Sequence, residues 1–333
     1  MSTDDARPRA HHILVCLDGS PHAEAALPYA MSLAKAFGSA ITLTQVLQPR
    51  HDNAGPHTTD PLAWEIARQE ARGYLERQEQ IVSESLGRPV AIRLEQGHPA
   101  ERIVDLAREL GADLTVLGSH GHGGVTEWNL GSTAQQVLAL ARGSVFIAHA
   151  ASGTPSFVSP RRILVPLDGS VRTESVLPTA ARIASAYGAE LMLVHIVKEP
   201  VASQVLPAGE DLELASGLAA RLEVNAAKYL ASVRARLAHE VPGVRTLVAR
   251  HANEGQCLLH LSREQHADLV VLSAHGVACD PSRVFGSVAS HLLTHSRVPL
   301  LVLQDLSDER GHTVGLVEQL APPLRASYPP EAM

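Results

Sequence analysis

Short apolar runs alternate along the chain with longer stretches in which apolar residues recur three and four positions apart. The short runs are rich in β-branched residues and predict strands at residues 13–17, 40–47, 90–95, 114–118 and 145–148. The longer stretches predict helices that start at Ser20, near Leu62, at Pro99 and at Gly131. Such alternation predicts a mostly parallel α/β sheet that is open at its edges and covered by helices on both faces.

The pattern occurs twice in the 333 residues. Residues 12–20 (HILVCLDGS) match residues 162–170 (RILVPLDGS) at an offset of 150. Further on, Gly131-Ser132 matches Gly286-Ser287 at an offset of 155, which predicts a small insertion near the second helix. The second copy runs from Ile163 to Leu303. We therefore expect two Rossmann-like, five-stranded sheets in tandem.

Small and polar residues separate the two copies. Residues 150–156 (AASGTPS) are typical of a linker. The predicted domains are residues 1–152 and 157–304. Residues 305–333 have no counterpart in the first copy, contain four prolines, and are expected to form a partly ordered tail.

Charge and cysteine content narrow the class of protein. The net charge of −7 and the pI of about 6.2 argue against a broad electrostatic contact with nucleic acid or a membrane and favour a small-molecule or protein partner. The three cysteines form no CxxC pair, and the chain has no run of roughly 18 apolar residues. We expect a cytoplasmic protein with free thiols.

The loop after the fourth predicted strand carries a glycine pattern. Gly118 and Gly121 are followed by nine residues and then by Gly131 and Ser132. Glycines let backbone approach a ligand or adopt positive φ, the following helix offers free N–H groups to an anion, and the Ser132 and Thr133 hydroxyls add donors. An isolated GxxG forms only turns in most cases, but the complete pattern favours nucleotide binding. No GxxxxGK[ST] motif is present, which excludes a P-loop.

Asp18 ends the first predicted strand on the other side of this expected site. Its carboxylate can accept hydrogen bonds from a ribose or adenine, or it can be a turn or helix-capping residue, a role that Ser20 can share. Both interpretations stay open.

Cys16 is interpreted as a small buried hydrophobe. The motif His120-x-His122 is a weak metal signal and favours loop packing or phosphate contact, while His291 and His295 are interpreted as ordinary helix residues.

Over residues 13–148 and 162–303 the sequence resembles the universal stress protein family in its tandem-domain form. The resemblance implies an adenine nucleotide alpha-hydrolase-like fold, ATP binding and a regulatory role in stress. It implies that Asp18 lies against the adenosine and backbone at Val46 meets the adenine edge. Ribose and phosphate contacts are implied for the loop residues. The implied ligand-binding positions are Cys16, Asp18, Val46, Leu117, Gly118, Gly121, Gly131, Ser132 and Thr133 in the first copy, and Pro166, Asp168, Ile196, Ser273, Gly276, Gly286, Ser287 and Val288 in the second.

The two copies differ at two of these positions. Ser273 stands where the first copy has Gly118, and its Cβ can block close backbone approach. Pro166 fits the family pattern better than Cys16 does. We therefore do not expect two equivalent ATP sites. The resemblance also implies that the fifth strands of the two copies pair within the chain, and it leaves a homodimer of whole chains open.

Three functions remain open from the sequence. The first is an ATP-binding regulator, and the second is a slow hydrolase or nucleotidyl transferase that uses Mg²⁺ held by the phosphates and Ser132. The first phosphate loop has no Arg or Lys, and no arrangement of catalytic residues is identifiable, which argues against fast phosphoryl transfer. The third is a nucleotide-free scaffold in which the glycines serve only turns.

Overall fold

The computed structural model describes residues 12–48, 61–120, 130–149, 159–199, 209–241, 243–278, 280 and 282–304, with side chains from residue 217 onward in the helix that begins at residue 209. The first copy alternates strands and helices as the sequence predicts. Its elements are β1 (His12–Leu17), α1 (Pro21–Glu24), α2 (Ala26–Phe37), β2 (Ala40–Leu47), α3 (Pro61–Leu86), β3 (Ala91–Gln96), α4 (Pro99–Leu110), β4 (Leu114–Gly118), α5 (Ser132–Leu140) and β5 (Ser144–Ala148).

The second copy repeats this order. Its elements are β6 (Arg162–Pro166), α6 (Val171–Glu174), α7 (Leu177–Tyr187), β7 (Glu190–Lys198), α8 (Gly209–Leu237), β8 (Gly243–His251), α9 (Glu254–Glu264), β9 (Leu269–Ser273), α10 (Ser287–His295) and β10 (Leu300–Leu303). The expected insertion lengthens the long helix from 26 to 29 residues and the strand after it from 6 to 9. The predicted linker and the predicted tail lie outside the described residues.

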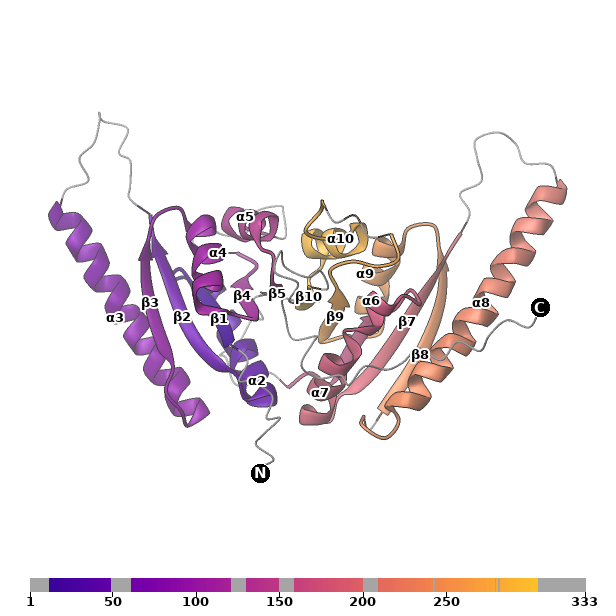
Figure 1. The fold of residues 1–333 in the computed structure, drawn as a ribbon, viewed down its shortest axis with the longest axis horizontal. Coiled ribbons are helices and arrows are strands. Elements are labelled where there is room, and N and C mark those ends of the chain that lie inside the picture. The colour runs from indigo at the N-terminus through magenta and orange to yellow at the C-terminus, as the bar shows by residue number, and fades with distance from the viewer. Residues whose placement is uncertain are drawn as a thin grey trace, which may run out of the picture.

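The two predicted five-stranded sheets are joined into one. The strand order is β3-β2-β1-β4-β5-β10-β9-β6-β7-β8, and every neighbouring pair is parallel except β5 and β10. These two strands pair antiparallel, with Leu300 opposite Ile147 and Val302 opposite Val145. Figure 1 shows the two copies meeting at this pair, with α3 and α8 on the outer flanks. The pairing of the fifth strands within the chain is confirmed.

Alternate residues of each strand enter two different cores. Ile13, Val15 and Leu17 of β1 pack with apolar residues of α2 and α3, while Leu14 and Cys16 pack on the opposite face with α4 and α5. The second copy has the same division, with α7 and α8 on one face and α9 and α10 on the other. A parallel strand that is buried on both faces needs this continuous apolar sequence.

A proline interrupts the first predicted helix of each copy. The sequence predicted one helix from Ser20, but the structure has a short helix and then a longer one in each copy. Pro28 and Pro178 have no N–H to donate to the carbonyl four residues earlier, at Glu24 and Glu174, so the hydrogen-bond ladder breaks there. The short helix begins at a serine cap, since Ser20 Oγ accepts a hydrogen bond from the Ala23 N–H at 3.2 Å.

Helices α2 and α7 form a second contact between the copies. The Arg182 Nε donates to the Ala36 carbonyl at 2.9 Å, and its guanidinium lies 5.3 Å from the ring centroid of Phe37. The Tyr187 hydroxyl donates to the Ser32 carbonyl at 2.6 Å. The copies are therefore held together on a helical face as well as through the sheet. In the part of the chain that the structure describes, no helix is long and apolar enough to cross a membrane.

Candidate functional site

The loops after β4 and β9 leave the sheet in the same way. In the first copy the Ser119 N–H donates to the Ala148 carbonyl at 2.7 Å, and the Gly131 N–H donates to the Ser119 carbonyl at 2.7 Å. In the second copy the corresponding bonds, from Ala274 to Leu303 and from Gly286 to Ala274, are both 2.8 Å. The backbone hydrogen bonds at the start and end of the two loops are thus equivalent. Gly121 and His122 lie outside the described residues.

Each of these loops leads into a helix whose N-terminus is not capped by a side chain. Gly131 and Gly286 are the N-caps of α5 and α10, and both have extended backbone with φ of −71° and −67°. Neither glycine therefore needs positive φ. Ser132, Thr133 and Ser287 lie exposed in the first turns. The first N–H groups of such a helix can bind an anion.

Gly118 allows close packing of backbone. A Cβ atom there would lie 2.8 Å from the His22 carbonyl oxygen and 2.9 Å from the Ala23 Cα. Because those atoms belong to the backbone of α1, they cannot move aside easily. At the equivalent position the second copy accommodates Ser273, which is buried. The Ser273 hydroxyl has no hydrogen-bond partner among the described residues. The glycine is thus a packing requirement of the first copy alone.

A cavity of about 740 Å³ lies at the carboxyl ends of the second copy's strands. Small-molecule sites usually have about 300–1,000 Å³. Residues from β6, β7, β9, α8, α9 and α10 line it. The sequence-predicted positions in this copy all line the cavity, namely Pro166, Asp168, Ile196, Ser273, Gly276, Gly286, Ser287 and Val288. The structure therefore brings together one set of predicted residues that are more than 100 positions apart in the sequence.

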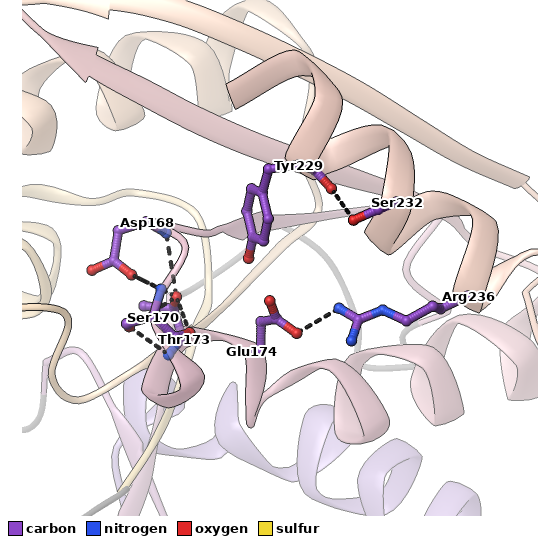
Figure 2. Close-up of polar contacts among 7 residues, drawn as sticks. All are labelled: Asp168, Ser170, Thr173, Glu174, Tyr229, Ser232 and Arg236. Carbon is purple, nitrogen blue, oxygen red and sulfur yellow. Dashed lines mark hydrogen bonds and ion pairs between the residues drawn. The ribbon is translucent and has the colours of Figure 1, made fainter. Parts of the chain in front are cut away.

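The Asp168 carboxylate joins two loops at one end of this cavity. It accepts hydrogen bonds from the Ser170 N–H at 2.9 Å, the Thr173 hydroxyl at 2.8 Å and the Val277 N–H at 2.7 Å. Figure 2 shows the contacts with Ser170 and Thr173. A Cβ atom at position 276 would lie 2.3 Å from Asp168 Oδ2, so Gly276 leaves room for the carboxylate.

These hydrogen bonds also determine the charge state of Asp168. Burial by itself raises the pKa of the carboxyl, but the hydrogen bonds from Ser170, Val277 and Thr173 together lower it below its usual value. Asp168 is therefore charged at neutral pH and is already bound by three protein donors. A turn role of this aspartate is directly visible, and contact with an adenosine stays a prediction.

Tyr229, which is not among the residues predicted from the sequence, lines the cavity from α8. Its ring makes an edge contact with His195, with centroids 6.0 Å apart. In Figure 2 its hydroxyl points toward Glu174, which pairs with Arg236 at 2.5 Å. Burial first, and then the charge of Glu174, raise the pKa of Tyr229. The hydroxyl is thus neutral.

The first copy has an equivalent tyrosine and glutamate, Tyr74 and Glu24. Burial and then Glu24 raise the pKa of Tyr74, and the Gln78 side chain donates to Glu24 at 3.2 Å. Glu24 precedes Glu174 by 150 positions, and Tyr74 precedes Tyr229 by 155, the two offsets of the repeat. This coincidence was the signal that could have identified the tyrosines. His195, Lys198, Asn225 and Glu254 also line the cavity and carried no such signal.

The first-copy residues occupy equivalent strand ends. The Asp18 carboxylate accepts a hydrogen bond from the Ser20 N–H at 2.9 Å, as a turn residue does. Val46 is half-buried near the end of β2, and Leu117 is buried in β4. Cys16 is buried, and burial raises the pKa of its thiol. Its interpretation as a small buried hydrophobe is confirmed.

The histidines of the loops contact protein groups. His120 Nδ1 lies 3.1 Å from the Ser119 hydroxyl, and His275 Nε2 lies 2.9 Å from the Arg283 carbonyl. These contacts agree with loop packing. The rings of His291 and His295 stack 4.4 Å apart on α10. Within the described ranges, no group of three or more His, Cys, Asp or Glu residues is arranged to hold a metal ion.

The universal stress protein family model matches residues 10–149 and again residues 160–304. The chain belongs to the universal stress protein family. A universal stress protein of Mycolicibacterium smegmatis is 27% identical over 299 residues, covering 88% of this chain and 96% of the relative. One of Mycobacterium tuberculosis is 27% identical over 308 residues, covering 89% and 98%. A shorter one of Thermus aquaticus is 35% identical over 132 residues, covering 38% and 90%.

Solved structures of universal stress proteins share this fold over about nine tenths of the chain. One from Archaeoglobus fulgidus covers 89% of this chain and 99% of its own, with a TM-score of 0.61 and 18% identity. A putative universal stress protein from Pseudomonas aeruginosa covers 90% and 95%, with a TM-score of 0.56 and 16% identity. At these identities the likeness shows the fold alone. Family members of similar length thus carry this fold.

Proposed function

We propose that this stress-family protein binds adenine nucleotides, ATP in particular, and regulates a protein partner in response to the nucleotide. The observation that carries the proposal is the cavity of about 740 Å³ into which all the second-copy positions converge. Its volume suits a nucleotide, and its position beyond the carboxyl ends of parallel strands is where open α/β sheets bind ligands.

The lining of the cavity has two chemically different parts. Gly286 and Ser287 supply the uncapped start of α10, where backbone N–H groups and the helix dipole favour phosphate. Apolar side chains such as Ile196, Leu258 and Val288 offer a surface to a base. When present, Mg²⁺ would neutralise phosphate charge, and Ser287 in this copy or Ser132 in the first would supply a hydroxyl ligand.

Binding is favoured over rapid phosphoryl transfer. Among the described residues that line the cavity, Lys198 is the only lysine or arginine. Phosphoryl transfer needs several positioned charges on the transferring group. Slow hydrolysis remains the alternative, and phosphate release at saturating ATP and Mg²⁺ tests it. A rate at background removes the hydrolase and leaves the binding protein.

Charge placed at the helix N-terminus tests the site directly. We expect Ser287→Asp to weaken ATP binding at the second site at least tenfold, because a carboxylate there repels phosphate. An acidic residue in the first turn favours the helix itself, so folding is preserved. Ser287→Asn has nearly the same shape without the charge and is the control. Ser132→Asp and Ser132→Asn form the matched pair for the first site.

Calorimetry with ATP measures these affinities, and heat-denatured protein is analysed for released nucleotide. We expect adenine nucleotide in the supernatant and two sites of unequal affinity. No released nucleotide together with no heat of binding would refute the proposal and favour a scaffold. Equal binding by the aspartate and asparagine variants would place the phosphates elsewhere.

The cellular part of the proposal is an action in the cytoplasm through a protein partner, with whole chains able to form a homodimer. The acidic net charge of −7 supports partners other than nucleic acid or anionic lipid. Cell fractionation tests the compartment, and sedimentation with and without ATP tests the assembly.

A further inference from the structure

Gln304 is a buried polar residue between the two copies, with 2% of its surface exposed. It directly follows β10. Its backbone N–H donates to the Ser144 hydroxyl of the first copy at 3.1 Å. Its side-chain Nε2 donates to the Val284 carbonyl of the second copy at 3.3 Å. One residue therefore joins the first copy's β5 to the second copy's loop.

The Val284 carbonyl, which accepts the hydrogen bond from Gln304, lies at the end of the loop between β9 and α10. Val284 precedes the α10 N-cap, Gly286, by two positions. The neighbouring Arg283 carbonyl is held by His275, and the Gly286 N–H is held by Ala274. These contacts set where the first N–H groups of α10 lie relative to the cavity. A buried amide that keeps such a carbonyl in place therefore positions the anion-binding end.

The connection to the other copy runs in one direction only. At the repeat offset of 155, Ser144 corresponds to Pro299 and Gln304 corresponds to His149. Proline has no hydroxyl, so the second copy cannot accept the reciprocal hydrogen bond from the His149 N–H of the first copy. The backbone hydrogen bonds where the two loops leave the sheet repeat in both copies, but the hydrogen bond to the Ser144 hydroxyl has no counterpart among the described residues. The second site is thus the one whose geometry depends on its neighbour.

We propose that Gln304 is a positioning residue that makes phosphate binding at the second site depend on the first domain, through Ser144. This inference rests on the proposed nucleotide function. The contact between Gln304 and Ser144 would then influence ligand binding as well as stability. A change in this contact alters the phosphate affinity of the second cavity, while the affinity for an uncharged nucleoside stays the same.

The test uses the full chain with Ser132→Asp, which is expected to weaken phosphate binding at the first site, so that the second site dominates ATP binding. ATP and adenosine are titrated by calorimetry against this parent and against its Gln304→Leu and Ser144→Ala derivatives. The loss of one hydrogen bond that holds the loop is expected to weaken ATP binding up to about tenfold. Adenosine affinity is expected to change less than about twofold, since no contact with the nucleoside is altered.

Ser296→Ala is the matched control. Ser296 is the buried C-cap of α10, in the connection that precedes β10, and its hydroxyl donates to the Val298 carbonyl at 2.8 Å. This change lowers stability without touching the loop, so the ratio of ATP to adenosine affinity is expected to stay at the parent value.

An unchanged ratio in both Gln304→Leu and Ser144→Ala, with the parent binding ATP, overturns the positioning role and leaves the nucleotide function standing. Equal weakening of ATP and adenosine also overturns it, because the residue then acts only on stability. A parent that binds no ATP while the wild type binds it overturns the positioning role alone, and a wild type that binds no ATP overturns both proposals. If Gln304→Leu does not fold, Ser144→Ala alone decides.

Discussion

The Asp168 carboxylate lies 2.7 Å from the backbone nitrogen of Val277, so the loop after β6 is tied to the loop after β9 by one charged hydrogen bond. Val277 follows Gly276 at the mouth of the cavity. Ordering of the phosphate loop is therefore expected to depend on the charge of Asp168.

Asp168→Asn keeps the shape and removes the charge. Because the folded protein lowers the pKa of Asp168, its contribution to stability is complete above the usual aspartate pKa of about 3.9 and is lost as the pH falls through the lower folded value. We expect Asp168→Asn to melt at a lower temperature than the wild type at pH 7, with the difference shrinking below about pH 4. Melting curves between pH 3 and pH 7 measure this. A difference that stays constant with pH contradicts it.

The difference between Gly118 and Ser273 predicts that a glycine–serine exchange destabilises the protein at position 118 but not at position 273. Gly118→Ser places a side chain against α1 backbone at 2.8–2.9 Å, and overpacking of this kind is expected to cost about 1–3 kcal/mol. Ser273→Gly removes a buried unpaired hydroxyl but adds backbone freedom, and these effects nearly cancel, within about 1 kcal/mol. Urea unfolding of both variants compares them. Equal costs would show that close packing of α1 is not the reason for Gly118.

The stability of the first copy is expected to depend on pH through His149. Burial, and then the neighbouring His120, lower the pKa of His149 to about 4. A neutral buried histidine stabilises the fold fully above its unfolded pKa of about 6.5, and this contribution is lost as the pH falls toward 4. The loss amounts to at most about 3 kcal/mol.

His149→Gln introduces the residue that the second copy has at this position, Gln304, and removes the titration. We expect the variant to lose less stability than the wild type between pH 7 and pH 4.5. Urea unfolding at both pH values is the measurement, and His260→Gln, on an exposed surface of α9, is the control. Equal acid sensitivity of the wild type and His149→Gln rules out this role of His149.

Contacts between α2 and α7 are expected to stabilise the joined copies. Tyr187→Phe removes the hydrogen bond to Ser32, and Arg182→Met removes the one to Ala36 together with the contact on Phe37. Each change is expected to cost about 1 kcal/mol. Scanning calorimetry measures the loss and shows whether the copies then melt separately. Arg263→Met, in the last turn of α9, is the surface control.

Much of the fold was predictable because local patterns carry it. The offset of 150 at residues 12–20 established the duplication, and strand boundaries such as 40–47 and 114–118 were correct. The break between α1 and α2 was not predicted, although its cause, the missing N–H of Pro28, was in the sequence. Apolar periodicity detects the face of a helix, and it is insensitive to one lost hydrogen bond.

The second-copy site was predicted as a set of residues, and the structure shows that these residues share one cavity. The repeat offsets could have singled out Tyr229, but its contact with His195 in the lining was not predictable, because that contact depends on how α8 lies against β7. Likewise the contacts of Gln304 have no sequence signal, since Ser144, which its backbone N–H contacts, and Val284, which its side chain contacts, are distant in the chain. Such contacts follow from packing.

The alternation of strands and helices along the chain, the loop glycines and the duplication follow from the order of residues, because β-branched runs, turn residues and caps act over a few positions. The union of two sheets through β5 and β10, the use of Gly118 for packing rather than for φ, and the hydrogen bond from Val277 to Asp168 required the tertiary structure. The residues involved in each of these contacts come together only when the helices and strands pack. Periodicity along the chain contains no information about the distance in space between such residues.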